Sequence, residues 1–266
     1  MTSPGLTDSV LETAKRFPET YFEIAAGETR TDNIATYNGR LYEARYILGQ
    51  IAARMSQKGK IGYVAPAAAP DSFLSVNAFM LGAQSVNPAI VLYVAYIGTA
   101  YDAAREAAGA RAVIGQGADV MAYQTDSPAP AQVAEQSGVM VFGNGYDMDR
   151  YAPQAQLTSF VYDWGGYYTK RVMAALDDKW TTAGVWAGFR EGIVSLGPFR
   201  HMSEKAKGEA IATRQALIDG RLKLFTGPLY DHDGTLRLKE GETAGDEVLR
   251  NMDWYVKGNL VLVPMD

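Results

Sequence analysis

Apolar runs alternate with amphipathic stretches over the first two-thirds of the chain. The runs, such as VLYVAYI and VMVFG, are continuously apolar, which is typical of parallel strands buried on both faces. Between them, apolar residues recur at helical spacing, as in residues 40–58. Strand and helix thus alternate as βαβ units, and residues 60–145 are predicted to form a doubly wound domain. The elements expected here are strands at 60–66, 89–98, 118–125 and 139–145 and helices at 40–58, 73–88, 103–117 and 130–138.

The pattern changes after residue 155, where strands become shorter and glycines more frequent. We expect these later elements to pack with residues 1–58 and to build a second domain from both ends of the chain. The predicted fold class is therefore α/β, with two doubly wound parallel-sheet lobes joined by a hinge. The first lobe is assigned to residues 1–58 plus 166–266, and the second to residues 59–165. The elements expected outside the central domain are a helix at 2–18, strands at 21–27 and 33–39, an extended piece leading into a helix at 156–180, a strand region at 184–199, a helix at 204–221, two strands at 225–238 about an Asp233-Gly234 turn, and a final extended segment at 252–263.

The composition fits a globular protein of two domains. The chain has 266 residues, of which 47% are hydrophobic and 21% charged. Its net charge of −5 is spread along the sequence, whereas a nucleic-acid or membrane-surface binder would show clustered Lys and Arg. No stretch reaches the roughly 18–20 consecutive apolar residues of a membrane span. No secretory signal is visible at the N-terminus.

Few residues are available for catalysis or metal binding. The absence of cysteine excludes disulfides, Cys-ligated zinc and thiol catalysis. The two histidines, His201 and His232, lie in no recognisable motif and are interpreted as structural or solvated. The glycine-rich runs do not match G-x-x-x-x-G-K-[ST], and no G-x-G-x-x-G follows the first strand. We therefore expect a binding protein and not an enzyme, with no cofactor and no metal.

The corner after the strand at 118–125 reads Thr125-Asp126-Ser127-Pro128. Ser127 suits a helix N-cap and Pro128 the first helical position, where its missing N–H costs nothing. Asp126 then remains just past the carboxyl end of a strand, which is where ligands bind in open α/β sheets. From the corner alone, Asp126 is either a ligand contact or a turn former.

Segments distributed along the whole chain resemble the Bmp (basic membrane protein) family, in the family's order. They are YNGRLYEARYILGQIAARM, KIGYVAP, NAFMLGAQSVNP, QTDSP, QLTSFVYDWGGYY, FTGPLYDHDG and MDWYVKGNL. The resemblance implies a substrate-binding protein of an ABC importer with the type I periplasmic-binding-protein fold, periplasmic or lipid-anchored. It also implies a purine nucleoside or nucleobase as ligand, held in a cleft between two lobes, and an ABC permease in the membrane as partner.

The resemblance further implies that the first lobe is incomplete. Family members carry an exported segment with a first strand, a loop and a helix before the point that matches Thr2-Ser3-Pro4. We expect this chain to lack that β-α-β portion, including a loop that contributes ligand contacts. A misassigned start or shortened reading frame is the favoured explanation, and a fragment or degenerate copy is the alternative.

A purine needs flat apolar or aromatic plates for its faces and a carboxylate or amide for its edge. Asp126 is the best edge-binding candidate, and Asn144 and Tyr146 follow the next strand at the same sheet edge, either facing the cleft or forming a glycine-rich turn. Trp164 lies where the chain leaves the second lobe and is either a stacking plate or a core wedge. Phe189 is either a facing plate or a core residue.

Two further function classes stay open. The fold also permits an enzyme acting on a nucleoside or sugar. The aspartates of this chain are too dispersed in sequence to indicate a catalytic cluster. A sensor domain or a truncated, non-functional copy is the other alternative, and such a copy would expose sheet edge and apolar surface.

Overall fold

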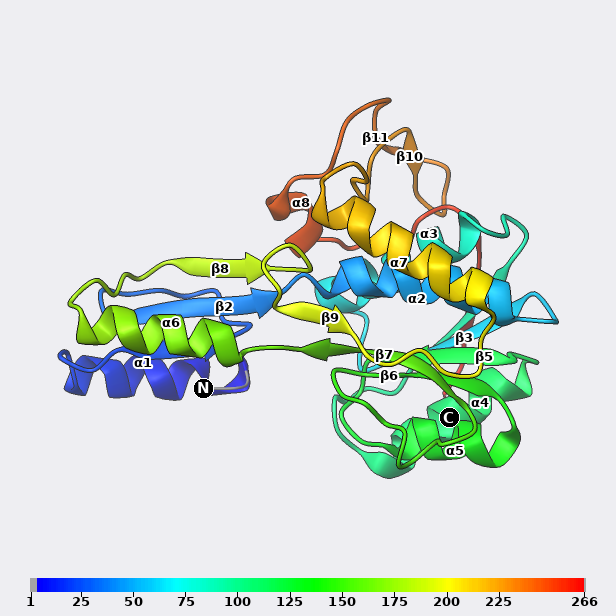
Figure 1. The fold of residues 1–266 in the computed structure, drawn as a ribbon, viewed down its shortest axis with the longest axis horizontal. Coiled ribbons are helices and arrows are strands. Elements are labelled where there is room, and N and C mark those ends of the chain that lie inside the picture. The colour runs from blue at the N-terminus through cyan, green and yellow to red at the C-terminus, as the bar shows by residue number, and fades with distance from the viewer. Residues whose placement is uncertain (1–3, 266) are drawn as a thin grey trace. The chain divides into compact units, whose positions relative to one another are not determined.

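The computed structural model describes residues 4–265, and it contains two compact units (Figure 1). One comprises Met1–Arg40 and Tyr162–Ser195, and the other Leu41–Val161 and Leu196–Asp266. We refer to them as the small unit and the large unit. The chain crosses between them three times, at residues 40–41, 161–162 and 195–196.

A seven-stranded sheet with the order β12-β4-β3-β5-β6-β7-β9 forms the centre of the large unit. The end of β7 and the start of β9 fall in the small unit. The pairings from β12 through β4, β3, β5 and β6 to β7 are all parallel, for example Ile61↔Leu92 and Ile61↔Val120, which confirms the predicted parallel sheet. The strands are β3 (Lys60–Ala65), β4 (Val91–Tyr96), β5 (Val120–Tyr123), β6 (Met140–Gly143), β7 (Gln156–Tyr162), β9 (Val194–Leu196) and β12 (Asn259–Val263).

Helices cover both faces of this sheet, as Figure 1 shows, and this explains the continuously apolar strands. Helices α2 (Leu41–Met55), α3 (Pro70–Gln84) and α7 (Glu204–Ile218) lie on one side, with α4 (Ala103–Gly115) and α5 (Ala129–Ser137) on the other. A short hairpin of β10 (Leu229–Tyr230) and β11 (Leu236–Leu238) confirms the turn predicted at Asp233-Gly234. Helix α8 (Asp246–Arg250) follows the hairpin.

Two glycines allow α2 and α3 to approach closely. A Cβ atom on Gly49 would lie 2.0 Å from the Phe79 carbonyl oxygen, and one on Gly82 would lie 1.9 Å from that of Tyr46. Any larger residue would force the two helix backbones apart. The two glycines therefore fix α2 against α3, which is one reason why α2 belongs to the large unit.

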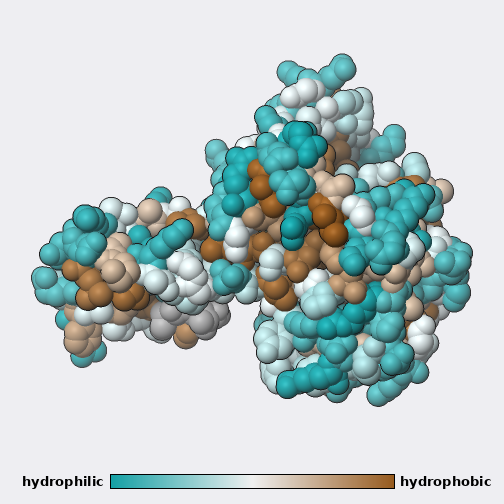
Figure 2. Space-filling model, viewed as in Figure 1, coloured by the Kyte–Doolittle hydropathy of each residue, from teal (hydrophilic) through white to brown (hydrophobic). Residues whose placement is uncertain are grey.

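The small unit contains a three-stranded parallel sheet with the order β1-β2-β8. Its elements are the turn η1 (Pro4–Leu6), helix α1 (Thr7–Arg16), β1 (Phe22–Ala25), β2 (Ile34–Gly39), α6 (Gly165–Leu176) and β8 (Gly184–Ala187). Val10, Ala14, Ile24 and Ile34 form a buried cluster between α1 and the sheet. Figure 2 shows apolar surface over this unit, where Val172, Met173 and Leu176 of α6 are exposed.

The compact units have boundaries different from those of the predicted lobes. The predicted first lobe includes residues 41–58 and 196–266, which lie in the large unit, and the predicted second lobe includes residues 162–165, which lie in the small unit. Strand β12 pairs with β4 (Leu260↔Leu92) instead of packing with residues 1–58. The expected helix at 2–18 is observed as η1 and α1, and its first two residues lie outside the described residues. Within residues 4–265, no helix is both long and apolar enough to span a membrane.

Candidate functional site

The carboxyl ends of β5 and β6 bring two candidate loops together. The strands are adjacent and parallel, with Val120 opposite Met140 and Met121 opposite Val141. The corner at residues 124–128 therefore lies beside the loop at residues 144–150. A direct hydrogen bond joins the two loops, from the Asn144 Nδ2 to the Thr125 carbonyl oxygen at 3.0 Å. The expectation that Asp126 and Asn144 share one sheet edge is met in the structure.

Asp126 presents an exposed carboxylate at this corner. Its backbone N–H donates to the Ala100 carbonyl oxygen at 3.0 Å, and within residues 4–265 no hydrogen bond reaches its side chain. Partial burial, and then the negative charge of Glu106, raise the pKa of the Asp126 carboxyl. The carboxylate does not cap α5, so it is available as an acceptor for a ligand edge.

Ser127 and a buried glutamate hold the corner in place. The Ser127 hydroxyl accepts from the Ala129 N–H at 3.2 Å, at the start of α5, while Pro128 occupies the N-cap position itself. The Ser127 N–H donates to the Glu106 carboxylate at 3.0 Å. Glu106 is fully buried and also accepts from the Asp102 N–H at 3.1 Å. Nothing in the sequence singles out Glu106, because a charged residue near the start of a helix is usually solvated.

Asn144 is bound on both sides of its amide. Besides its bond to Thr125, its Oδ1 accepts from the Arg45 Nη2 at 2.6 Å. Tyr146, in the same loop, is 65% exposed, so its ring is available to solvent. A Cβ on Gly143 would lie 2.5 Å from the Tyr146 carbonyl oxygen, so glycine is needed for the loop to fold back this closely.

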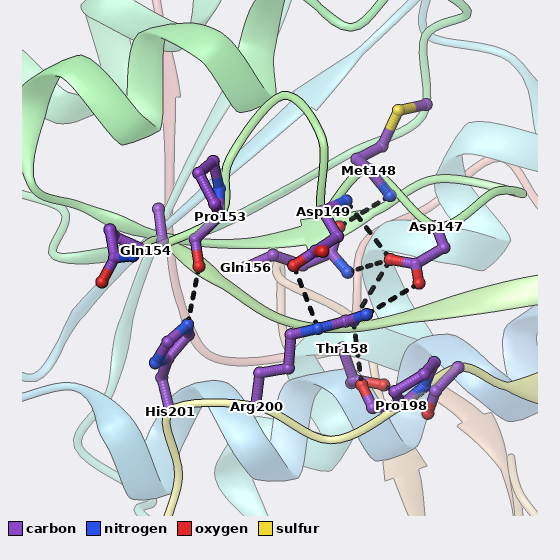
Figure 3. Close-up of polar contacts among 12 residues, drawn as sticks. Asp147, Met148, Asp149, Pro153, Gln154, Gln156, Thr158, Pro198, Arg200 and His201 are labelled. Atoms are coloured by element: carbon purple, nitrogen blue, oxygen red, sulfur yellow. Dashed lines mark hydrogen bonds and ion pairs between the residues drawn. The ribbon is translucent and has the colours of Figure 1, made fainter.

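An ion-pair cluster anchors the far end of this loop (Figure 3). Asp147 accepts from the Arg200 guanidinium at 3.0 and 3.2 Å and also from the Gln156 amide. Asp149 pairs with the Arg200 Nε at 3.0 Å. Burial alone would raise the pKa of Asp147, but the bonds from Gln156 and Arg200 outweigh it and hold the pKa below its usual value. The cluster ties the loop after β6 to the segment after β9.

Aromatic rings gather around Trp164 in the small unit. Trp164 is stacked on Tyr162 with ring centroids 5.3 Å apart and meets the edge of Tyr37 at 4.9 Å. Tyr168 is stacked on Trp164 with ring centroids 6.3 Å apart, and its hydroxyl forms a hydrogen bond with that of Tyr37 at 2.9 Å. Trp164 and Tyr162 are half-buried and Tyr168 is exposed. The cluster therefore offers accessible aromatic surface. This exposure favours the stacking-plate interpretation of Trp164 over the core wedge.

The remaining candidate of the small unit, Phe189, and the nearby Asp163 have different surroundings. Phe189 is only 5% exposed and lies in a turn closed by the Gly192 N–H on the Phe189 carbonyl oxygen. This burial favours the core interpretation for Phe189. Asp163 accepts from the Gly165 N–H at 3.3 Å, at the start of α6. A hollow of about 290 Å³ in this unit has Asp163, Lys170 and Glu191 in its lining.

The structure contains no evident site for a metal within the residues it describes, since no group of His, Asp and Glu there could hold an ion. His201 bonds the Pro153 carbonyl oxygen at 2.9 Å (Figure 3). His232 donates its backbone N–H to the Tyr255 carbonyl oxygen. The contact seen for His201 fits the structural role expected from the sequence.

A family model described as "ABC transporter substrate-binding protein PnrA-like" (Bmp) matches residues 1–224. The purine-binding protein BAB2_0673 of Brucella abortus is 43% identical over 257 residues, which are 97% of this chain and 73% of that protein. A Haloferax volcanii protein, TsgA13, provisionally named an ABC transporter glucose-binding protein, is 31% identical over 97% of this chain and 63% of its own length.

Solved structures share the fold. An ABC solute-binding protein from Aeropyrum pernix superposes with a TM-score of 0.70 at 19% identity, over 86% of this chain and 76% of that one. The transcriptional activator of the comK gene from Bacillus halodurans gives a TM-score of 0.74 at 20% identity, over 83% and 78%. The fold is thus the type I periplasmic-binding-protein fold, as predicted.

Proposed function

Since the chain belongs to the Bmp family of ABC transporter substrate-binding proteins, we propose that it captures a purine nucleobase or nucleoside for import. The family comprises binding proteins and not enzymes, and the enzymatic alternative is not favoured. The observation that carries the purine proposal is the 43% identity with a purine-binding protein over 97% of this chain.

The chemistry of the candidate residues supports this ligand class. The large unit offers the exposed carboxylate of Asp126, which can accept hydrogen bonds from N–H groups at a purine edge. The small unit offers the half-buried indole of Trp164 within a cluster of tyrosines. Aromatic stacking and a few placed polar groups are what a flat heterocycle requires.

The transport role follows from the family. We propose that the loaded protein delivers its ligand to an ABC permease and works outside the cytoplasmic membrane, either in the periplasm or attached through a lipid. Delivery would be tested by uptake of a radiolabelled purine in cells with and without the gene. Uptake that does not depend on the gene would contradict this role.

Thermal unfolding against a ligand panel tests the purine proposal. A ligand that binds only the folded state raises the midpoint of unfolding by mass action. The panel contains adenine, hypoxanthine, their nucleosides and glucose, the last because of the Haloferax relative. We expect a rise with purines only. A rise with glucose alone would replace the purine proposal with sugar binding.

Asp126→Asn provides the sharpest variant, with Asp253→Asn as control because that aspartate is also exposed. The folded protein raises the Asp126 pKa, so its ionised form slightly destabilises the fold above that pKa. We therefore expect Asp126→Asn to unfold at a slightly higher temperature without ligand, yet to lose most of the purine-induced rise. The control should keep the full rise. An undiminished rise in Asp126→Asn would exclude Asp126 from the site.

A further inference from the structure

A buried arginine lies behind the corner that carries Asp126. Arg45 lies in the second turn of α2, and its side chain is fully buried. Its guanidinium carbon lies 4.6 Å from the ring centroid of Phe160 and 5.5 Å from that of Tyr63. A buried charge costs several kcal/mol of free energy unless it is well hydrogen-bonded. The acceptors that Arg45 finds are therefore important for the local structure.

Asn144 is the hydrogen-bond acceptor found for this guanidinium. The Arg45 Nη2 donates to its Oδ1 at 2.6 Å, while Nε and Nη1 have no hydrogen-bond partner among residues 4–265. No carboxylate within that range forms an ion pair with Arg45 either. The buried charge thus depends strongly on the oxygen of a single amide.

This arrangement permits only one orientation of the Asn144 amide. Arginine has donors only, and the Thr125 carbonyl oxygen can only accept. Asn144 must turn its oxygen to Arg45 and its nitrogen to Thr125. In a flipped amide, the nitrogen would face the Arg45 donors and the oxygen would face the Thr125 carbonyl oxygen, so neither bond could form. The nitrogen keeps one further N–H, and the side chain is partly exposed.

We propose that Arg45 is a positioning residue for ligand binding, acting through Asn144. It holds the Asn144 oxygen inward, so that Asn144 secures the Thr125–Asp126 corner and offers the ligand an N–H donor but no acceptor. Asp126 offers the complementary acceptor. The pair therefore selects a ligand edge on which a donor and an acceptor are neighbours, as an exocyclic amine and ring nitrogen are in adenine. This inference rests on the proposed function.

Affinity measurements with adenine on four variants test the inference. Arg45→Met and Asn144→Ala should each weaken binding about 5- to 150-fold, because a buried ligand acceptor that loses the Asn144 N–H is left unsatisfied at a cost of about 1–3 kcal/mol. In the Asn144→Ala background, Arg45→Met should change the affinity less than about threefold, because the group it acts through is gone. Asn144→Asp should also bind weakly: it keeps an oxygen for Arg45 but directs a second one at the Thr125 carbonyl. Additive losses, or wild-type affinity in Arg45→Met, would overturn the proposal.

A second readout does not depend on the ligand. The Asn144 side-chain amide should give distinct, slowly exchanging NMR signals in the wild-type protein and lose that protection in Arg45→Met. If no purine binds, the proposed function fails, and these signals still decide whether Arg45 orients Asn144. Unchanged protection in Arg45→Met would contradict the inference.

Two further variants separate positioning from loss of fold. Arg45→Lys retains a donor at this position. If Arg45→Met folds poorly, Arg45→Lys should still show part of the adenine affinity and part of the protection of the Asn144 amide. Arg54→Met is the matched control, because Arg54 lies on the same helix but pairs with Glu209 at the surface. It should leave both readouts unchanged. Equal effects of Arg54→Met and Arg45→Met would show that only the stability of α2 matters.

Discussion

The corner after β5 and the cluster around Trp164 are held in place by different forces. The corner is fixed by directional bonds to buried charged groups, from Ser127 to Glu106 and from Arg45 through Asn144 to Thr125. The Trp164 cluster is held by ring packing and a bond between two hydroxyls, and it is partly open to solvent. Directional bonds fix the positions of single atoms, whereas stacked rings fix a plane and tolerate sliding. We infer that the corner discriminates between ligand edges and that the aromatic cluster contributes affinity with little discrimination.

Among the variants that test this difference between the two regions, Glu106→Ala should have the largest effect, on the stability of the corner. The change removes the acceptor of two backbone N–H groups, the buried one of Ser127 and the partly buried one of Asp102, at up to about 1–3 kcal/mol each. We expect the free energy of unfolding to fall by about 2–5 kcal/mol, as measured by urea denaturation. Glu209→Ala is the control, since it breaks only the surface pair with Arg54 and should cost less than about 1 kcal/mol. Similar losses in both variants would mean that Glu106 does not hold the corner.

A smaller effect is expected from Trp164→Ala, and it should fall on affinity for all bases alike. Stacking of a base on an aromatic side chain contributes about 1–3 kcal/mol, so purine binding should weaken about 5- to 150-fold. The ratio of affinities for adenine and hypoxanthine should stay nearly constant, because stacking contacts the ring face and the two bases differ at their edges. Titration calorimetry measures both quantities. A changed ratio with unchanged adenine affinity would reverse the roles assigned to the two regions.

The smallest effect is expected from the Asp147–Arg200 pair, through its pH dependence. The folded protein lowers the pKa of Asp147, so the pair contributes stability above the ordinary pKa of 3.8 and loses it as the pH falls below that value. Arg200→Gln should therefore reduce the difference in urea midpoint between neutral pH and about pH 3. An unchanged difference would show that the pair contributes no measurable stability.

The strands and helices were predictable because apolar positions follow the periods of buried strands and amphipathic helices. The sequence did not show which elements pack against each other. For example, the close approach of Gly49 and Gly82 to carbonyl oxygens of the facing helix leaves no periodic pattern in the sequence. The sequence therefore predicts α2 in the first lobe, whereas the structure packs it in the large unit.

The candidate site was predictable where it follows strand ends. Asp126 and Asn144 do lie beside each other, because neighbouring parallel strands end at one edge. Arg45 and Glu106 were missed, since charged residues usually lie in solvent. One signal was available: Arg45 precedes the buried Leu48, Gly49 and Ala52 by three, four and seven positions, so it falls inside the buried stripe of α2.

The central claim is tested most directly by titration calorimetry of the wild-type protein and Asp126→Asn with adenine, and with glucose for comparison. The account predicts saturable binding of adenine, a loss of at least about tenfold in Asp126→Asn, and no heat from glucose. Saturable binding of glucose without binding of adenine, or equal adenine affinity in both proteins, would contradict it.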